Sequence, residues 1–120
     1  MDGIRNDPGE GERFENEIRT ALVKCALPHL TAIEFTVHGE GYEGPDPHTH
    51  ADHTDSFYVL EGELELTLGD ETFRAGPGTF VAAPPGVRHG FKVPPQAGPV
   101  RFLNVHAPGG FEHDMRRMNS

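Results

Sequence analysis

Two histidines that could bind a metal together, His48 and His50, lie near the middle of the 120-residue chain with one residue between them. On an extended strand, residues i and i+2 project from the same face, so the two imidazoles would lie side by side. Paired imidazole nitrogens suit a divalent transition metal. An isolated His-x-His pair is more often a pair of solvent-facing loop residues, so the interpretation needs further ligands.

Further candidate ligands occur at two places. His53 and Asp55 follow the pair within five residues, and His89 lies just after the turn Pro84-Pro85-Gly86. The segment between Asp55 and His89 contains several glycines, which allow turns that could bring His89 back against the first pair. Three histidines and a carboxylate form a recurring ligand set for iron, manganese and related metals. Apolar residues nearby would surround such a site with a dry wall: Phe57, Val59 and Phe91.

The segments that must position these residues are predicted to be short strands, because 15 glycines and 11 prolines divide the chain into short apolar runs. The alternation with a period of two is clear in Thr31–His38. Glu61-Gly62 is interpreted as a tight turn between antiparallel partners. Strands without intervening helices predict an all-β antiparallel sandwich or barrel: Ile18–Ala26, Thr31–His38, Ser56–Leu60, Glu63–Leu68, Glu71–Arg74, Thr79–Ala83, Val87–Val93 and Val100–Ala107.

The chain length and composition predict one domain over 13–120, preceded by a flexible tail over 1–12. The polar, Gly- and Glu-rich stretch 2–17 is expected to be partly disordered. After Pro108-Gly109-Gly110, apolar residues recur at helical spacing, with acidic residues first and arginines late. This pattern predicts a short C-terminal helix over 111–118 that covers one edge of the barrel.

The charge and cysteine content limit the partners. A formal net charge of −9 argues against a nucleic acid or an anionic membrane surface, and the single cysteine excludes an internal disulfide. No apolar stretch approaches the length of a membrane span and the N-terminus lacks a signal-peptide core, so we expect a cytoplasmic protein. An open barrel usually hides its edge strands, so we also expect a homodimer, which a sedimentation mass of 13.1 kDa would contradict.

Two stretches resemble the paired motifs of the cupin superfamily. The first motif is Gly-x5-His-x-His-x3–4-Glu-x6-Gly. His48 and His50 match it, Asp55 stands where glutamate is expected, and six residues separate Asp55 from Gly62. The upstream glycine is displaced: the motif places five residues between this glycine and the first histidine, whereas six residues separate Gly41 from His48 and three separate Gly44 from His48.

The second motif is Gly-x5-Pro-x-Gly-x2-His-x3-Asn. Gly78, Pro84, Gly86 and His89 match it at every interval, and Val93 stands in place of the asparagine. The run from Ser56 to Gly62 is also typical of small bacterial cupins. The resemblance covers roughly Thr31 to Ala107 and implies a double-stranded β-helix, or jelly-roll barrel.

The resemblance implies one divalent transition metal ion per chain, bound by His48, His50, Asp55 and His89, with iron, manganese or nickel favoured over zinc. Aspartate is one methylene shorter than glutamate, which withdraws the carboxylate by roughly 1.5 Å. Either the backbone moves inward, or a water bridges Asp55 to the metal, or His53 is the fourth ligand instead. We favour Asp55 because it keeps the motif register, and a three-histidine site is the rival.

The resemblance also suggests an activity. The chain end Val105–Glu112 looks like the close of quercetinase-like dioxygenases, which implies an oxygenase that acts on a small aromatic or enolic metabolite. The alternatives are a non-redox isomerase, cyclase or lyase, and a small-molecule-binding module without turnover. Asn104 and His106 share a face with Phe102. The expected substrate pocket consists of Phe57, Val59, Phe91, Val93, Phe102, Asn104 and His106.

Overall fold

The computed structural model describes residues 3–38, 42, 44, 46–95 and 98–110, and every regular element within these residues is a β-strand. The strands are β1 (Glu12–Glu15), β2 (Arg19–Leu27), β3 (Leu30–Val37), β4 (Thr54–Glu61), β5 (Leu64–Leu68), β6 (Glu71–Ala75), β7 (Phe80–Ala83), β8 (His89–Lys92) and β9 (Val100–Ala107). No helix in the described part of the chain has the length and apolar character needed to cross a membrane.

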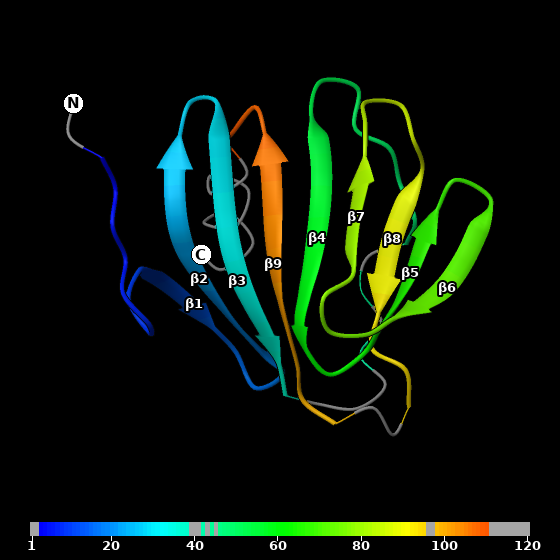
Figure 1. Cartoon of the computed structure of the whole chain (residues 1–120), viewed down its shortest axis with the longest axis horizontal. Helices are drawn as coiled ribbons and strands as arrows, with labels where there is room; N and C mark the ends of the chain where they lie inside the picture. Colours follow the sequence, from blue (N-terminus) through cyan, green and yellow to red (C-terminus); the bar gives the residue numbers. More distant parts are fainter. Residues whose placement is uncertain (1–2, 39–41, 43, 45, 96–97, 111–120) are drawn as a thin grey trace.

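The strands form two antiparallel sheets (Figure 1). The larger sheet has the order β1-β2-β3-β9-β4-β7, and the smaller has the order β6-β5-β8. Each named strand pairing is antiparallel. The all-β antiparallel architecture predicted from the sequence is therefore confirmed.

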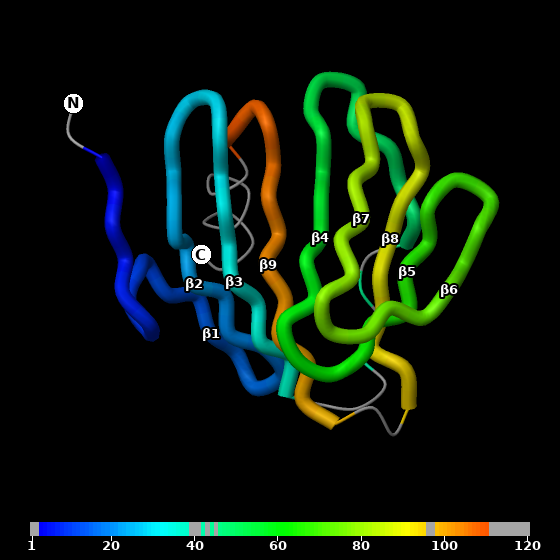
Figure 2. Tube along the Cα trace, viewed as in Figure 1, coloured from blue at the N-terminus to red at the C-terminus, as the bar shows by residue number. Residues whose placement is uncertain are grey.

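The second half of the chain passes back and forth between the sheets, as the tube in Figure 2 shows. It leaves the larger sheet after β4, forms β5 and β6 in the smaller one, returns as β7, crosses again to β8 and ends in β9. As a result, the beginnings of β4 and β8 and the end of β9 meet at one end of the molecule. That end holds the candidate ligands.

The core lies between the sheets and follows the period of two expected of half-buried strands. In β3 and β9, buried residues alternate strictly with less buried ones over Leu30–Val37 and Val100–His106. Phe102 is fully buried, and its ring centroid lies 5.3 Å from that of Phe35, 5.3 Å from that of Phe91 and 6.0 Å from that of Phe57. Four aromatic rings thus form the centre of the core.

All eight predicted strands are present, with shifted ends. β4 begins two residues earlier than predicted, and β8 is shorter than the predicted Val87–Val93. The additional strand β1 lies within the stretch 2–17, where composition suggested partial disorder, and pairs with β2 through Arg13 and Leu22. The helix predicted for 111–118 lies outside the described residues.

The prediction of a hairpin at Glu61-Gly62 is wrong. β4 pairs with β7 and β9, whereas β5 pairs with β6 and β8, so the turn joins strands of different sheets. A turn signal between two apolar runs shows where the chain reverses but not which strand becomes the hydrogen-bonding neighbour.

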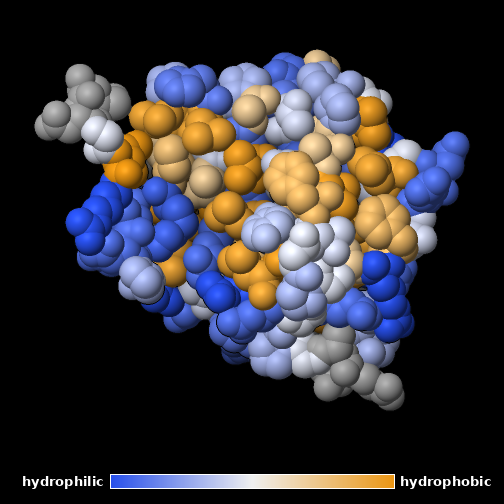
Figure 3. Space-filling model, viewed as in Figure 1, coloured by the Kyte–Doolittle hydropathy of each residue, from blue (hydrophilic) through white to orange (hydrophobic). Residues whose placement is uncertain are grey.

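One exposed aromatic pair lies beside the edge of the larger sheet. Tyr58 on β4 and Phe80 on the edge strand β7 are 39% and 62% exposed, and their ring centroids are 6.4 Å apart. Hydrophobic residues extend across the upper and central part of the face seen in Figure 3. A second protein chain often covers such a surface. The homodimer expected from the sequence stays a prediction.

The turn between the sheets makes Gly62 a sensitive position. Gly62 has φ = +77°, and an added Cβ would lie 2.5 Å from the carbonyl oxygen of Pro99. Gly69 has φ = +61° with no atom within 4 Å of the same position, which makes it a matched control. We expect Gly69→Ala to cost about 1 kcal/mol for the left-handed backbone alone, and Gly62→Ala to cost at least about 1 kcal/mol more. Urea unfolding of both variants measures the difference, and equal losses would contradict it.

Candidate metal centre

The site is built around Asp55, a carboxylate on the inward face of β4. Asp55 shares this face with Phe57 and Val59, and all three are buried. A buried carboxylate is costly unless other groups compensate its charge and donate hydrogen bonds to its oxygens. The surrounding residues therefore have to supply donors.

Four side chains approach Asp55. The Nε2 of His89 donates a hydrogen bond to Oδ2 at 3.0 Å, and the Nδ2 of Asn104 donates to Oδ1 at 2.6 Å. The Nε2 of His106 lies 3.4 Å from Oδ1, and the Nε2 of His50 lies 3.5 Å from Oδ2. One carboxylate oxygen thus faces β9, and the other faces the histidines of the metal motifs.

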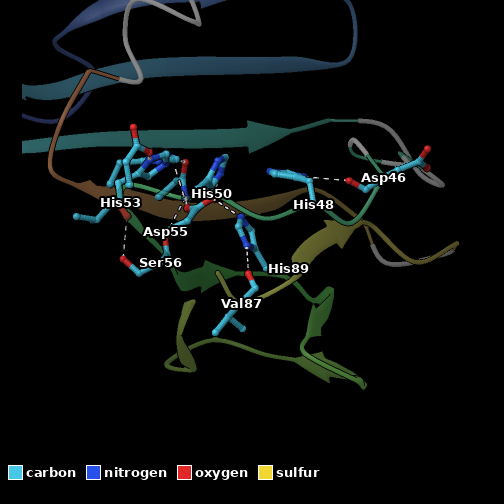
Figure 4. Close-up of polar contacts among 12 residues, drawn as sticks. Asp46, His48, His50, His53, Asp55, Ser56, Val87 and His89 are labelled. Atoms are coloured by element: carbon cyan, nitrogen blue, oxygen red, sulfur yellow. Dashed lines mark hydrogen bonds and ion pairs between the residues drawn. The ribbon is translucent and has the colours of Figure 1, made fainter. Parts of the chain in front are cut away.

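His48 and His89 are held as cross-strand neighbours. The backbone N–H of each donates to the carbonyl of the other, at 2.9 Å and 2.8 Å. Each ring donates its Nδ1–H to the carbonyl two residues upstream, that of Asp46 or that of Val87, at 3.0 Å in both cases (Figure 4). This second hydrogen bond fixes the tautomer that a metal requires and directs Nε2 toward the site.

The four candidate ligands lie close together in the structure. His48, His50, Asp55 and His89 each offer a ligand atom, and these atoms all lie within 4.8 Å of one another. Ligand atoms bonded to one transition metal at about 2.0–2.2 Å lie no more than about 4.4 Å apart. The four ligand atoms are therefore gathered closely enough that small side-chain movements would bring them around one ion, and the residues fit a divalent transition metal.

The protonation states agree with such a site. Burial acts to raise the pKa of Asp55, but the hydrogen bond from His89 and the neighbouring His106 and Asn104 outweigh it and lower this pKa. Burial acts to lower the pKa of His89, but its hydrogen bonds to Asp55 and to the carbonyl of Val87 raise it. A proton therefore lies between Asp55 and His89, where a bound cation would replace it.

His50 is neutral near pH 7. Burial lowers its pKa, and the neighbouring His53 and His89 add to this effect. Metal binding requires neutral imidazole, so the environment of His50 favours the ligand form.

His53, the alternative fourth ligand, lies beside the four converging residues and is not one of them. Its Nδ1 donates to Oδ1 of Asp52 at 2.9 Å, and its ring is stacked on that of His50 with centroids 4.1 Å apart. Its Nε2 is buried and has no hydrogen-bond partner within the described residues. His53 is outside the group of atoms that converge within 4.8 Å.

The site opens into a cavity of about 810 Å³. Of the expected pocket residues, Phe57, Phe91, Asn104 and His106 line it. Val59, Val93 and Phe102 do not line it, because they lie farther from the ligand cluster, in the filled part of the core, where they are 1% exposed or less. These three side chains are buried, and the period of two in the sequence does not show where the core ends and the cavity begins.

Several lining residues were not expected from the sequence. Arg19, Phe35 and the segment Pro108–Gly110 line the cavity, as does Tyr42, whose ring lies 6.2 Å from that of Phe91. The signal for Phe35 and Arg19 was available, because each shares a face with apolar residues on a predicted strand.

These features define a small antiparallel β-barrel with a histidine- and carboxylate-lined site at one end. The family model described as "Cupin domain" matches residues 33–106, and the chain belongs to this family. The jelly-roll barrel implied by the motif resemblance is thereby confirmed.

One curated relative is the Quercetin 2,3-dioxygenase of Bacillus subtilis (strain 168), which is 25% identical over 114 residues. The match covers 93% of this chain and 33% of the relative, so the chain spans about a third of that protein's length.

Solved structures show the same fold. KdgF from Halomonas sp. has a TM-score of 0.76 at 22% identity, covering 91% of this chain and 98% of that one. An RmlC-like cupin from Shewanella frigidimarina has a TM-score of 0.77 at 20% identity, covering 91% and 94%. Pac13 from Streptomyces, described as a nucleoside dehydratase, has a TM-score of 0.68 at 21% identity, covering 94% and 88%.

The buried His106 makes stability depend on pH. Burial, with the neighbouring histidines, lowers its pKa from 6.5 to about 4, although Asp55 acts in the opposite direction. Because the folded pKa is depressed, the unfolded chain binds the proton first, and this residue's contribution to stability is lost as pH falls from 6.5 to 4. One pKa unit corresponds to ~1.4 kcal/mol, which makes the loss roughly 3 kcal/mol.

We expect His106→Gln to flatten this dependence, because glutamine does not titrate. Urea unfolding of chelator-treated wild type and variant at pH 7 and pH 4.5 measures the difference between the two proteins. Parallel losses of stability in both would contradict the assignment.

Proposed function

We propose that this cupin is a metal-dependent oxygenase that acts on a small aromatic or enolic metabolite. The observation that carries the proposal is the convergence of three histidines and a carboxylate at the end of a cavity of about 810 Å³ with aromatic walls. The likeness to a quercetin dioxygenase supports the reaction class.

In this proposal, the ligands are Nε2 of His48, His50 and His89, and Oδ2 of Asp55. The choice of Asp55 over His53 rests on its hydrogen bonds. Asn104 holds Oδ1 at 2.6 Å and leaves Oδ2 toward the histidines. The Nδ1–H of His53 is directed to Asp52 instead. Iron, manganese or nickel in this site would supply Lewis-acid and oxygen-dependent redox chemistry.

The residues around the ligands have separate tasks. The rings of Phe35, Phe57 and Phe91 exclude water and provide flat apolar surfaces for a planar substrate. Because Asp52 holds the Nδ1 proton of His53, Nε2 carries the lone pair and can accept a hydrogen bond from a substrate hydroxyl. Asn104 positions Asp55 and has no direct part in the chemistry.

The ligand assignment is tested by removing each candidate fourth ligand. We expect Asp55→Asn to weaken metal binding at least about 100-fold, because it removes the anionic ligand while keeping the side-chain shape. His53→Ala should change metal affinity less than about threefold. Elemental analysis and competition with a chelator measure both, and far-UV circular dichroism checks that the variants fold. Metal loss in His53→Ala alone would assign the position to His53.

The reaction class is tested by metal content and oxygen uptake. We expect protein purified without chelator to contain iron, manganese or nickel, and to consume oxygen with a flavonol such as quercetin. The Asp55→Asn variant should lose this uptake. Zinc without oxygen uptake would replace the proposal with a non-redox isomerase, cyclase or lyase, and a metal-free protein would favour a binding module without turnover.

A further inference from the structure

An arginine lies on the inward face of the barrel, where apolar residues are expected. Arg19 is the first residue of β2 and shares its face with Ala21 and Val23, which are 0% and 6% exposed and belong to the core. The intervening Thr20 faces the other way, where its hydroxyl donates to Glu15. Arg19 therefore projects inward and lines the cavity.

The guanidinium of Arg19 is positioned by an aromatic ring. Its Cζ lies 5.7 Å from the centroid of the Phe35 ring. Phe35 is 5% exposed and stacks on Phe102, so the ring cannot easily move. A guanidinium held over a ring face keeps the N–H groups along its own edge free to donate. Two of these N–H groups can bind the two oxygens of a carboxylate at the same time.

No carboxylate pairs with Arg19 in the described part of the chain, although acidic residues are abundant. Several other arginines do have partners: Arg13 pairs with Glu15, and Arg101 pairs with Glu34 and Glu61. A partly buried guanidinium without a counter-ion is costly. A ligand that supplies the missing anion would recover that cost.

The other charges of the cavity decide what kind of anion fits. Within the described residues, the lining includes three carboxylates, of which Asp52 and Asp55 are engaged by histidines and Asp46 is exposed. Arg19 is the one lysine or arginine among these lining residues. This balance favours a single negative charge, as on a carboxylate, over the double charge of a phosphate.

The strand register gives the length of a molecule that reaches both groups. Asp55 is paired with His106, whereas Phe35, which holds Arg19, is paired with Phe102, four residues away on β9. Four residues of strand span roughly 13 Å between Cα positions. An aromatic ring with a short carboxylated side chain fits within this span, because the side chains of Asp55 and Arg19 take up part of it.

We infer that the substrate of the metal site is an aromatic or enolic carboxylate, with its anionic end bound by Arg19 and its oxygen function directed to the ligand cluster. This inference rests on the proposed function, to which it adds a substrate class. A neutral flavonol would leave Arg19 without its counter-ion, so the natural substrate differs from a flavonol in carrying a carboxylate.

The first test uses metal-free protein, so that it does not depend on the metal. Cinnamate and its uncharged analogue cinnamamide are titrated by calorimetry at low ionic strength. We expect cinnamate to bind wild type at least about tenfold more tightly than cinnamamide. Arg19→Gln should abolish the preference and Arg19→Lys should keep part of it. Arg13→Gln, the matched control at an exposed arginine outside the cavity, should keep it in full.

Equal affinity for the two ligands, no cinnamate binding at millimolar concentration, or a preference that persists in Arg19→Gln would overturn the inference. A second titration with metal-loaded protein compares 3,4-dihydroxycinnamate with neutral 4-ethylcatechol. If metal strengthens the binding of both, but Arg19→Gln does not alter their ratio, the proposed function stands and the carboxylate site fails. If the cinnamate preference holds but metal strengthens neither catechol, the proposed function fails instead.

Discussion

The buried carboxylate of Asp55 is the interaction on which the site depends. It lies on the apolar face of β4, and its charge requires compensation from every side. β9 provides Asn104 and His106, while β8 provides His89 from the other sheet. Asp55 therefore links the two sheets at the end where the barrel is open. The passage of the chain between the sheets makes this possible, because it brings the start of β8 next to the start of β4.

The short aspartate side chain explains why the carboxylate is shared in this way. Asp55 pairs in register with His106 on β9, so its Oδ1 stays close to the larger sheet and within reach of Asn104 at 2.6 Å. A glutamate would extend about one C–C bond, roughly 1.5 Å, farther into the cavity. In this chain the anionic candidate ligand is anchored to the sheet, so closure around an ion would fall to the histidines. His48 and His89 are held in a fixed relative position, because their backbones are hydrogen-bonded to each other.

Much of this arrangement could be predicted from the sequence, for physical reasons. The period of two in Thr31–His38 and Val100–Ala107 indicated the strands and their buried faces. The motif spacing indicated four candidate ligands, whose ligand atoms lie close together in the structure. The sequence did not reveal that β4 and β5 belong to different sheets, because a turn signal contains no information on non-local pairing. Nor did the sequence distinguish Phe102, which lies inside the filled core, from Phe57, which lines the cavity, because both side chains are predicted to face inward.

Phe102 also connects the ends of the cavity. Its ring packs against Phe35, which supports Arg19, and against Phe57 and Phe91, which form the walls. Phe57 in turn lies 6.5 Å from the ring of His89. A change in the volume of Phe102 would therefore displace two features together, because densely packed rings transmit displacement. These features are the Phe35 ring that supports Arg19 and the cavity wall beside the candidate ligands. Phe102, which does not line the cavity, would thus help to set the distance between the two groups that are proposed to bind the substrate.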